Sequence, residues 1–175
     1  MSSQEGFIGL GSNLDDPAAQ VSLALQQLGE RSIAIDKVSS LYHTEPVEAL
    51  SQPWFTNAVA RVISPFEPRD LLSICQEIET RQGRQRTRSG HHEARPIDLD
   101  LLMVGEEAVA TPELTLPHPR LHLRRFVLVP LAEIAPDWVH PTLGLSAKEL
   151  LRRSLDTASV VRIAPPPIFR AVSSR

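Results

Sequence analysis

The chain has 175 residues, a formal net charge of −3, 42% hydrophobic residues and 22% charged residues, which is typical of one globular domain or at most two small ones. A chain of this length can bury a core without disulfides, and its single cysteine, Cys75, excludes an internal disulfide and a cysteine-based zinc site. No apolar run approaches the ~20 residues of a membrane span, and the first residues lack the pattern of a secretory signal. We therefore expect a cytoplasmic protein that binds neither membranes nor nucleic acid.

The N-terminal third predicts strand, helix and strand. The apolar run over residues 6–10 predicts a strand that ends at the following glycine turn. Asp16 and Pro17 supply a capping acid and a first helical residue, and apolar residues at helical spacing extend this helix to Gly29. Partial alternation predicts a second strand over residues 33–42.

The middle of the chain predicts a third strand, a second helix, a loop and a fourth strand. Residues 58–63 are apolar except for Arg61, and three of the six are β-branched, which favours a strand; Pro68 begins a helix that ends near Gly83. Residues 84–96 are polar and basic without periodicity, which indicates a loop, and residues 97–104 predict the fourth strand.

This order predicts an α+β fold. Strand, helix, strand, strand, helix, strand is the ferredoxin-like βαββαβ pattern, an antiparallel sheet with two helices on one face. Beyond it we expect a C-terminal helical extension, with helices near residues 127–135 and 146–154. Residues 1–159 are expected to form a single domain, and residues 160–175 a loosely ordered C-terminal tail.

Asp98 and Asp100 are the sharpest chemical signal. Residues i and i+2 of a strand point to the same side, so the two carboxylates would lie roughly 7 Å apart along the chain. Aspartate is uncommon in strands, and two like charges on one face repel unless a cation such as Mg²⁺ lies between them. The alternative is a solvated strand face that carries two acids and no ligand.

Arginines and aromatic residues indicate a phosphate-bearing ligand with a planar ring. Five of the sixteen arginines lie between residues 81 and 95, and guanidinium groups beside carboxylates and Mg²⁺ are what phosphoryl transfer requires. Phe55 and Phe126 could stack on a ring and Asn57 could bind its edge, although composition alone slightly favours a core role for both phenylalanines. His118 could bind phosphate or cap a turn, and no P-loop motif is present.

These segments together resemble the 6-hydroxymethyl-7,8-dihydropterin pyrophosphokinases of folate biosynthesis. The matching motifs occur in the family's order and lie at residues 9–14, 39–46, 52–58, 79–84, 95–102, 116–120 and 124–131. The resemblance covers residues 6–155 and implies a ferredoxin-like pyrophosphokinase domain. It also implies that the chain transfers the pyrophosphoryl group of ATP to the hydroxymethyl oxygen of the pterin and releases AMP.

The resemblance also implies roles for individual residues. Asp98 and Asp100 would hold two Mg²⁺ ions along the triphosphate, and Arg84 and Arg95 would complete the catalytic set by neutralising the transferred group. The nucleotide would contact both arginines and four further residues, Gln76, Glu79, His118 and Arg124. The pterin pocket would be lined by Thr44, Val47, Phe55, Asn57 and Phe126, with the pterin ring between the two phenylalanines.

Two stretches depart from the family's pattern. Family members commonly carry Trp-Gly-Pro before the arginine matched by Arg95, where this chain has residues 90–94, one residue longer; Leu123 stands where an acid is frequent. These departures leave an inactive family member as one alternative, which the retained aspartates and arginines argue against.

Two other functions fit parts of the pattern. An RNA-binding module would need exposed sheet aromatics in a signature that this chain lacks, and the candidate ring-binding residues argue against a metal-dependent phosphohydrolase. We expect a monomer or a homodimer whose partners are ATP and the pterin.

Overall fold

A computed structural model describes residues 3–46, 51–83, 95–106 and 108–169 of the chain. It is a mixed α/β fold built on a six-stranded antiparallel sheet with the order β5-β1-β4-β3-β8, in which β2 also pairs with β4. The sheet strands are β1 (Gln4–Ser12), β2 (Ala34–Val38), β3 (Leu41–Thr44), β4 (Phe55–Ser64), β5 (Asp98–Val104) and β8 (Val160–Ala164). The helices are α1 (Pro17–Glu30), α2 (Pro68–Arg81), α3 (Arg125–Ile134) and α4 (Ala147–Arg153), with a short 3-10 turn at Leu121–Leu123.

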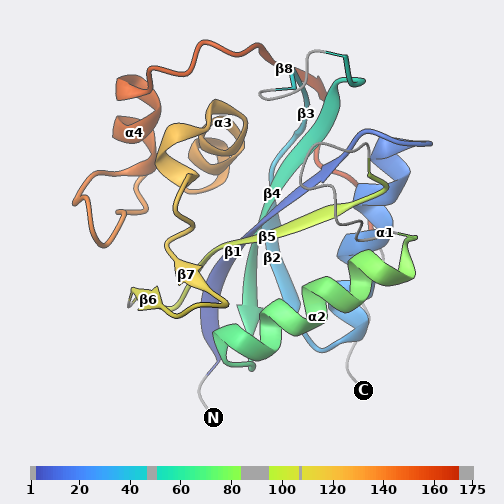
Figure 1. The fold of residues 1–175 in the computed structure, drawn as a ribbon, viewed down its shortest axis with the longest axis horizontal. Helices are drawn as coiled ribbons and strands as arrows, with labels where there is room; N and C mark the ends of the chain where they lie inside the picture. Colours follow the sequence, from blue (N-terminus) through green and yellow to red (C-terminus); the bar gives the residue numbers. More distant parts are fainter. Residues whose placement is uncertain (1–2, 47–50, 84–94, 107, 170–175) are drawn as a thin grey trace.

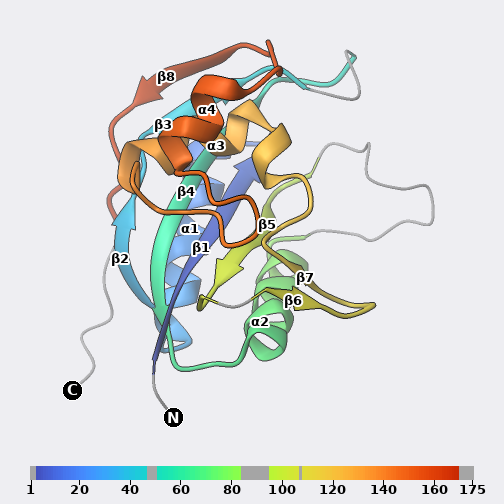
Figure 2. The ribbon, with the colours of Figure 1, turned by 90° about the vertical axis from the view of Figure 1, so that its left-hand side faces the viewer.

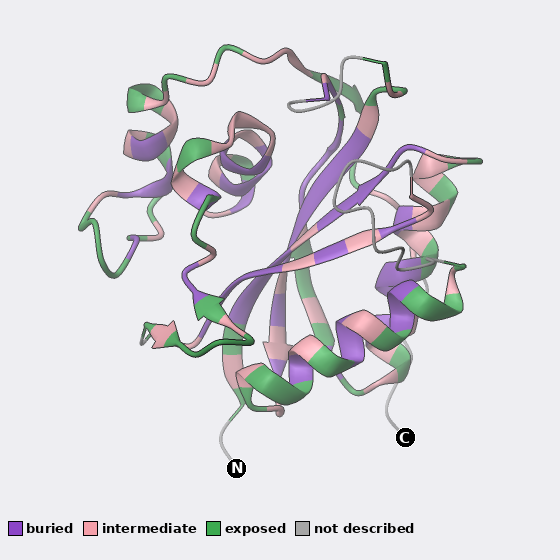
Figure 3. Ribbon diagram, viewed as in Figure 1, coloured by how far each residue is buried: buried purple, intermediate pink, exposed green. Residues whose placement is uncertain are grey.

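The sheet lies between two pairs of helices. Figure 1 shows α1 and α2 together on one side of the strands and α3 and α4 together on the other, and Figure 2 shows the same layers from the side. Helix α1 packs against β1, α2 against β5, and α3 against β4 and β3. Buried residues run along the central strands (Figure 3), so both layers share a core to which β1, β4 and β5 each contribute mostly buried residues.

The predicted starts of the first two helices are confirmed. The Asp16 side chain accepts a hydrogen bond from the backbone N–H of Ala19 at 3.1 Å, and Pro17 begins α1. Helix α2 begins at Pro68 and ends two residues before Gly83, whose φ of 92° lies in the region that favours glycine. None of the helices in the described part of the chain is long and apolar enough to cross a membrane.

The predicted second strand is two strands, so the prediction of one strand over residues 33–42 is wrong. Both β2 and β3 pair with β4, and the ladder is interrupted at Ser39 and Ser40. Ser39 donates its backbone N–H to Val59 O at 2.9 Å, and its hydroxyl oxygen accepts from Val59 N at 2.9 Å. The Ser39 hydroxyl thus takes the place of a backbone acceptor opposite Val59, and the N–H of Ser40 donates to the Glu133 side chain of α3 instead of to a strand.

The C-terminal segment also differs from the prediction. Residues 160–164, predicted to belong to a loose tail, form β8, which pairs antiparallel with β3 and places Arg162 opposite Tyr42. This stretch is rich in β-branched residues, and the edge of β3 offers it unpaired backbone groups, so pairing overrides the tail-like composition that follows. A separate hairpin of β6 (Val109–Ala110) and β7 (Thr115–Leu116) lies in the proline-rich stretch, where its two-residue strands carry no periodicity.

Candidate active site

A cleft of about 630 Å³ lies between the sheet, α2 and the start of α3, and the predicted site residues meet there. Those that the structure describes all line it: Thr44, Phe55, Asn57, Gln76, Glu79, Arg95, Asp98, Asp100, His118, Arg124 and Phe126. Two further predicted residues, Val47 and Arg84, lie outside the described residues. The structure therefore brings together side chains that are more than 80 residues apart in the sequence.

The two aspartates of β5 line this cleft from one side of the strand. Asp98 and Asp100 are half-buried, while Leu99 between them is buried, as the alternation predicted. Arg95 Nη1 lies 3.2 Å from Asp98 Oδ2, so a guanidinium is already held beside one carboxylate. Two carboxylates directed into an open cleft fit Mg²⁺, which takes one or two carboxylates from a protein and completes its shell with water and phosphate oxygens.

Glu79 connects α2 to the same strand. Its side chain is buried, and its Oε1 accepts a hydrogen bond from the backbone N–H of Leu99 at 2.8 Å, between the two aspartates. Burial, and then the charges of Glu79 and Asp100, raise the pKa of the neighbouring Cys75 thiol, so that thiol stays protonated. Through its hydrogen bond to Leu99, the Glu79 carboxylate holds the strand that carries the candidate metal ligands, and it also lines the cleft.

His118 is held as a neutral hydrogen-bond donor. Its Nδ1 accepts from the backbone N–H of Arg120 at 3.1 Å, which leaves the proton on Nε2. Burial, and then the charges of Arg124 and Arg120, lower the pKa of His118 to about 4. At neutral pH this residue can therefore donate to an anionic oxygen without carrying a charge itself.

This lowered pKa predicts how stability changes with pH. The pKa of His118 is about 4 in the folded state and 6.5 ordinarily, so protonation of this side chain favours the unfolded state. Neutral His118 therefore contributes to the free energy of unfolding above pH 6.5, and this contribution is lost as the pH falls toward 4. His118→Gln removes this titration, so thermal unfolding should show the wild type losing more stability than the variant between pH 7 and pH 4.5. Parallel curves for the two proteins would contradict the neutral assignment.

A second group of side chains forms the end of the cleft nearest β3. Asn57 Nδ2 donates to Thr44 Oγ1 at 2.6 Å, and this buried hydrogen bond fixes the orientation of the amide. Phe55 is the first residue of β4 and Phe126 lies in the first turn of α3; both are half-buried and line the cleft. The guanidinium carbon of Arg124 lies 5.5 Å from the centre of the Phe126 ring, so a basic group borders the aromatic surface.

Gly11 provides the space that the Asn57 side chain occupies. A Cβ atom at Gly11 would lie 2.4 Å from Asn57 Oδ1, and the Asn57 amide is held in place by the bond from its Nδ2 to Thr44. Gly11→Ala should therefore destabilise the fold by about 1–3 kcal/mol through overpacking and weaken binding of a ring ligand at Asn57. Thermal unfolding and ligand titration check this. Gly29→Ala is the matched control because a Cβ there meets nothing within 4 Å; equal effects of the two variants would refute the crowding argument.

Asn13 is a site-forming residue to which the sequence assigned no role. Its Oδ1 accepts from the backbone N–H of Arg95 at 2.9 Å, and its Nδ2 donates to Gln52 Oε1 and Pro53 O, each at 3.3 Å. The residue is buried and directly follows β1, which continues through Gly11 to Ser12 where the sequence predicted a glycine turn; the glycines that precede it are the signal that could have identified it. Among the other lining residues that were not predicted, three have polar or charged side chains: Glu45, Gln52 and Arg120.

Comparison of the chain with known proteins identifies one family. The family profile described as 7,8-dihydro-6-hydroxymethylpterin-pyrophosphokinase matches residues 7–136. The chain belongs to this pyrophosphokinase family. The 2-amino-4-hydroxy-6-hydroxymethyldihydropteridine pyrophosphokinase of Haemophilus influenzae is 41% identical over 151 residues, which cover 86% of this chain and 92% of that protein. The equally named protein of Bacillus subtilis is 39% identical over 73% of this chain and 76% of its own length.

Solved structures of other proteins share the fold of this chain. A crystal structure of Plasmodium falciparum HPPK-DHPS aligns with a TM-score of 0.70 over 86% of this chain at 14% sequence identity. The chain corresponds to 45% of that longer protein. At this identity the likeness supports the mixed α/β fold alone, whereas the family membership rests on the profile and on the curated relatives.

Proposed function

We propose that the chain transfers the pyrophosphoryl group of ATP to the hydroxymethyl oxygen of 6-hydroxymethyl-7,8-dihydropterin, giving AMP and the pterin diphosphate. One observation carries this proposal: a single cleft joins a carboxylate pair, a basic group and an aromatic–amide pocket. The first two suit a metal-bound polyphosphate, and the third suits a planar heterocycle. The names of the curated relatives support the same reaction.

The polyphosphate would lie along β5 and the start of α3. Asp98 and Asp100 would hold two Mg²⁺ ions, which when bound neutralise charge on the triphosphate. Arg95, which pairs with Asp98, would neutralise charge on the transferred group, and Arg124 and the Nε2–H of His118 would bind further phosphate oxygens. These groups hold the phosphate chain in one orientation, which is the main contribution a protein makes to phosphoryl transfer.

The remaining nucleotide contacts come from α2 and the segment that follows it. Gln76 and Glu79 lie on the cleft-facing side of α2, where they would contact the nucleotide. Arg84, outside the described residues, stays a prediction as the second arginine on the transferred group.

The pterin would lie against β3, β4 and α3. Asn57, oriented by Thr44, would bind the edge of the heterocycle, and Phe55 and Phe126 would contact its two faces. Val47 stays a prediction as a further lining residue. In this arrangement the hydroxymethyl group would face the phosphates, so that holding both reactants in one cleft would favour transfer over hydrolysis of ATP.

We also infer the finer architecture and setting. The strand order β5-β1-β4 with β2 and β3 sharing the next edge matches a ferredoxin-like core, followed by a helical extension. We further infer a catalytic unit of one protomer, alone or within a homodimer. A folate enzyme of this type is expected in the cytoplasm.

Nucleotide products test the reaction directly. The purified protein is incubated with ATP, Mg²⁺ and 6-hydroxymethyl-7,8-dihydropterin, and AMP, ADP and phosphate are separated and quantified. AMP should form only when the pterin is present, and chelation of Mg²⁺ with EDTA should abolish it. ADP or phosphate formed at the same rate without pterin would refute transfer and favour a phosphohydrolase.

A further inference from the structure

Glu133 of α3 accepts hydrogen bonds from two residues at and just after the break between β2 and β3. Glu133 itself does not line the cleft. Its Oε1 accepts from the backbone N–H of Ser40 at 3.0 Å and from Ser40 Oγ at 2.8 Å. Its Oε2 accepts from the Tyr42 hydroxyl at 2.5 Å and lies 3.1 Å from Ser40 N. The N–H of Ser40, in the break between β2 and β3, thus finds its acceptor on a helix.

Hydrogen bonds and a nearby positive charge favour the ionised form of the Glu133 carboxylate. Burial alone would raise the pKa of Glu133, but hydrogen bonds from Tyr42 and Ser40 and the nearby charge of Arg162 lower it below its ordinary value. Burial, and then the hydrogen bond to Glu133, raise the pKa of Tyr42 to about 12, so its hydroxyl remains a donor. Arg162 Nε donates to Ser40 Oγ at 2.8 Å, which ties β8 into the same network.

The two elements that Glu133 joins both contribute residues to the candidate pterin pocket. Phe126 lies seven residues before Glu133 on α3, and Thr44 lies two residues after Tyr42 on β3. In the β3–β4 ladder Tyr42 is opposite Asn57 and Thr44 is opposite Phe55. The carboxylate therefore links the helix that carries one aromatic face to the strand pair that carries the other face and the polar edge.

We propose that Glu133 is a positioning residue that sets the separation between Phe126 and the β3–β4 wall, and so determines the affinity for the pterin. The inference rests on the proposed function. Dispersion contacts weaken steeply with distance, and a gap of roughly 0.5–1 Å forfeits a quarter to a half of their energy. A pocket with two aromatic faces therefore depends on what holds those faces at the correct spacing.

Glu133→Gln tests this with little change in side-chain volume. The amide keeps one acceptor oxygen but presents an NH₂ group that cannot accept from Tyr42 or Ser40. We expect KM for the pterin to rise about 5–10-fold, which corresponds to the loss of one hydrogen bond, while KM for ATP changes by less than about twofold. Tyr42→Phe removes the same bond from the other side. The double variant should therefore be about as impaired as Glu133→Gln alone.

Lys37→Met is the matched control. Lys37 Nζ donates to Ile134 O at 3.5 Å, a long contact between the same helix end and β2, on the side away from Thr44. This variant should keep wild-type values of both KM constants.

Three outcomes would overturn the proposal. They are unchanged KM values in folded Glu133→Gln, equal rises in both KM values together with a lowered Tm, and multiplicative effects of the two substitutions. Should Glu133→Gln fail to fold, Ser40→Ala removes only the hydroxyl contact and should give a smaller rise in KM for the pterin alone. An absence of pterin-dependent AMP from the wild-type protein would instead refute the proposed function.

Discussion

Asp98→Asn is expected to reduce pterin-dependent AMP formation by about 10²–10³-fold, the usual scale for removing one electrostatic stabiliser from an active site. The amide has the shape of the carboxylate but not its charge, so it binds Mg²⁺ poorly and no longer pairs with Arg95. Initial rates measured over a series of Mg²⁺ concentrations check this. The variant should also need more Mg²⁺ to reach half of its own maximal rate.

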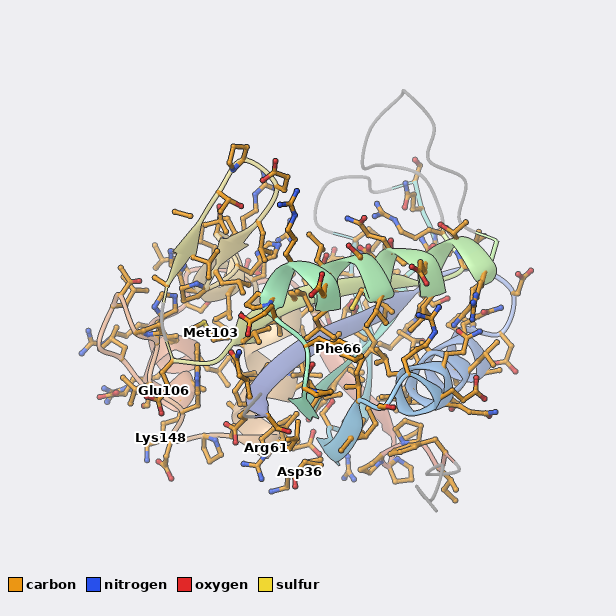
Figure 4. The ribbon with its side chains drawn as sticks, turned by 90° about the horizontal axis from the view of Figure 1, so that it is seen from below. Asp36, Arg61, Phe66, Met103, Glu106 and Lys148 are labelled. Atoms are coloured by element: carbon orange, nitrogen blue, oxygen red, sulfur yellow. The ribbon has the colours of Figure 1, made fainter. Side chains whose placement is uncertain are left out.

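Asp36→Asn is the control for removing a strand aspartate. Asp36 on β2 pairs with Arg61 on β4 at 2.5 Å, and Figure 4 shows the two side chains together at the underside of the molecule. Neither residue lines the cleft, so this variant should keep its rate and its Mg²⁺ requirement. Asp98→Asn with a normal rate at ordinary Mg²⁺ concentrations would show that the metal assignment is wrong.

Phe55→Ala is expected to weaken pterin binding by about 10–100-fold. The substitution removes one aromatic face, and burial of such a ring contributes about 1.5–3 kcal/mol. Titration calorimetry with the pterin in the presence of a non-hydrolysable ATP analogue measures the change, and the affinity for the analogue alone should be unaffected. The change should therefore appear in KM for the pterin more than in KM for ATP.

Trp54→Ala is the matched control because it removes the adjacent aromatic residue. Trp54 packs on His43, with ring centres 4.9 Å apart, and does not line the cleft. Its loss should leave pterin affinity unchanged. Equal affinities in Phe55→Ala and the wild type would mean that Phe55 serves only the edge of the core.

Local signals in the sequence predicted most of the regular elements. Asp16 and Pro17 determine the start of α1 by their own chemistry, and alternation over residues 97–104 predicted both β5 and the side on which its aspartates lie. Such signals involve residues that are close together in the chain, so they can be recognised from one sequence without knowledge of the fold.

Elements that depend on distant partners were not predictable in this way. The break between β2 and β3 arises because the Ser39 hydroxyl substitutes for a backbone group opposite Val59, twenty residues away. Strand β8 forms because β3 leaves an edge available for pairing. Neither the length nor the register of β8 can be predicted from the residues of β8 alone. In the site, the bond from Leu99 to Glu79 likewise follows from helix packing and not from any motif.

Asn13 has a consequence for how the two substrates influence each other. The amide of Asn13 bonds to the backbone of Arg95, on the proposed nucleotide side, and to the carbonyl of Pro53, two residues before Phe55 on the proposed pterin side. A ligand that shifts either segment therefore changes the hydrogen-bond geometry of the other. A shared bond of this kind creates a coupling free energy between the two sites, and it is reciprocal: whatever factor bound pterin applies to nucleotide affinity, bound nucleotide applies to pterin affinity.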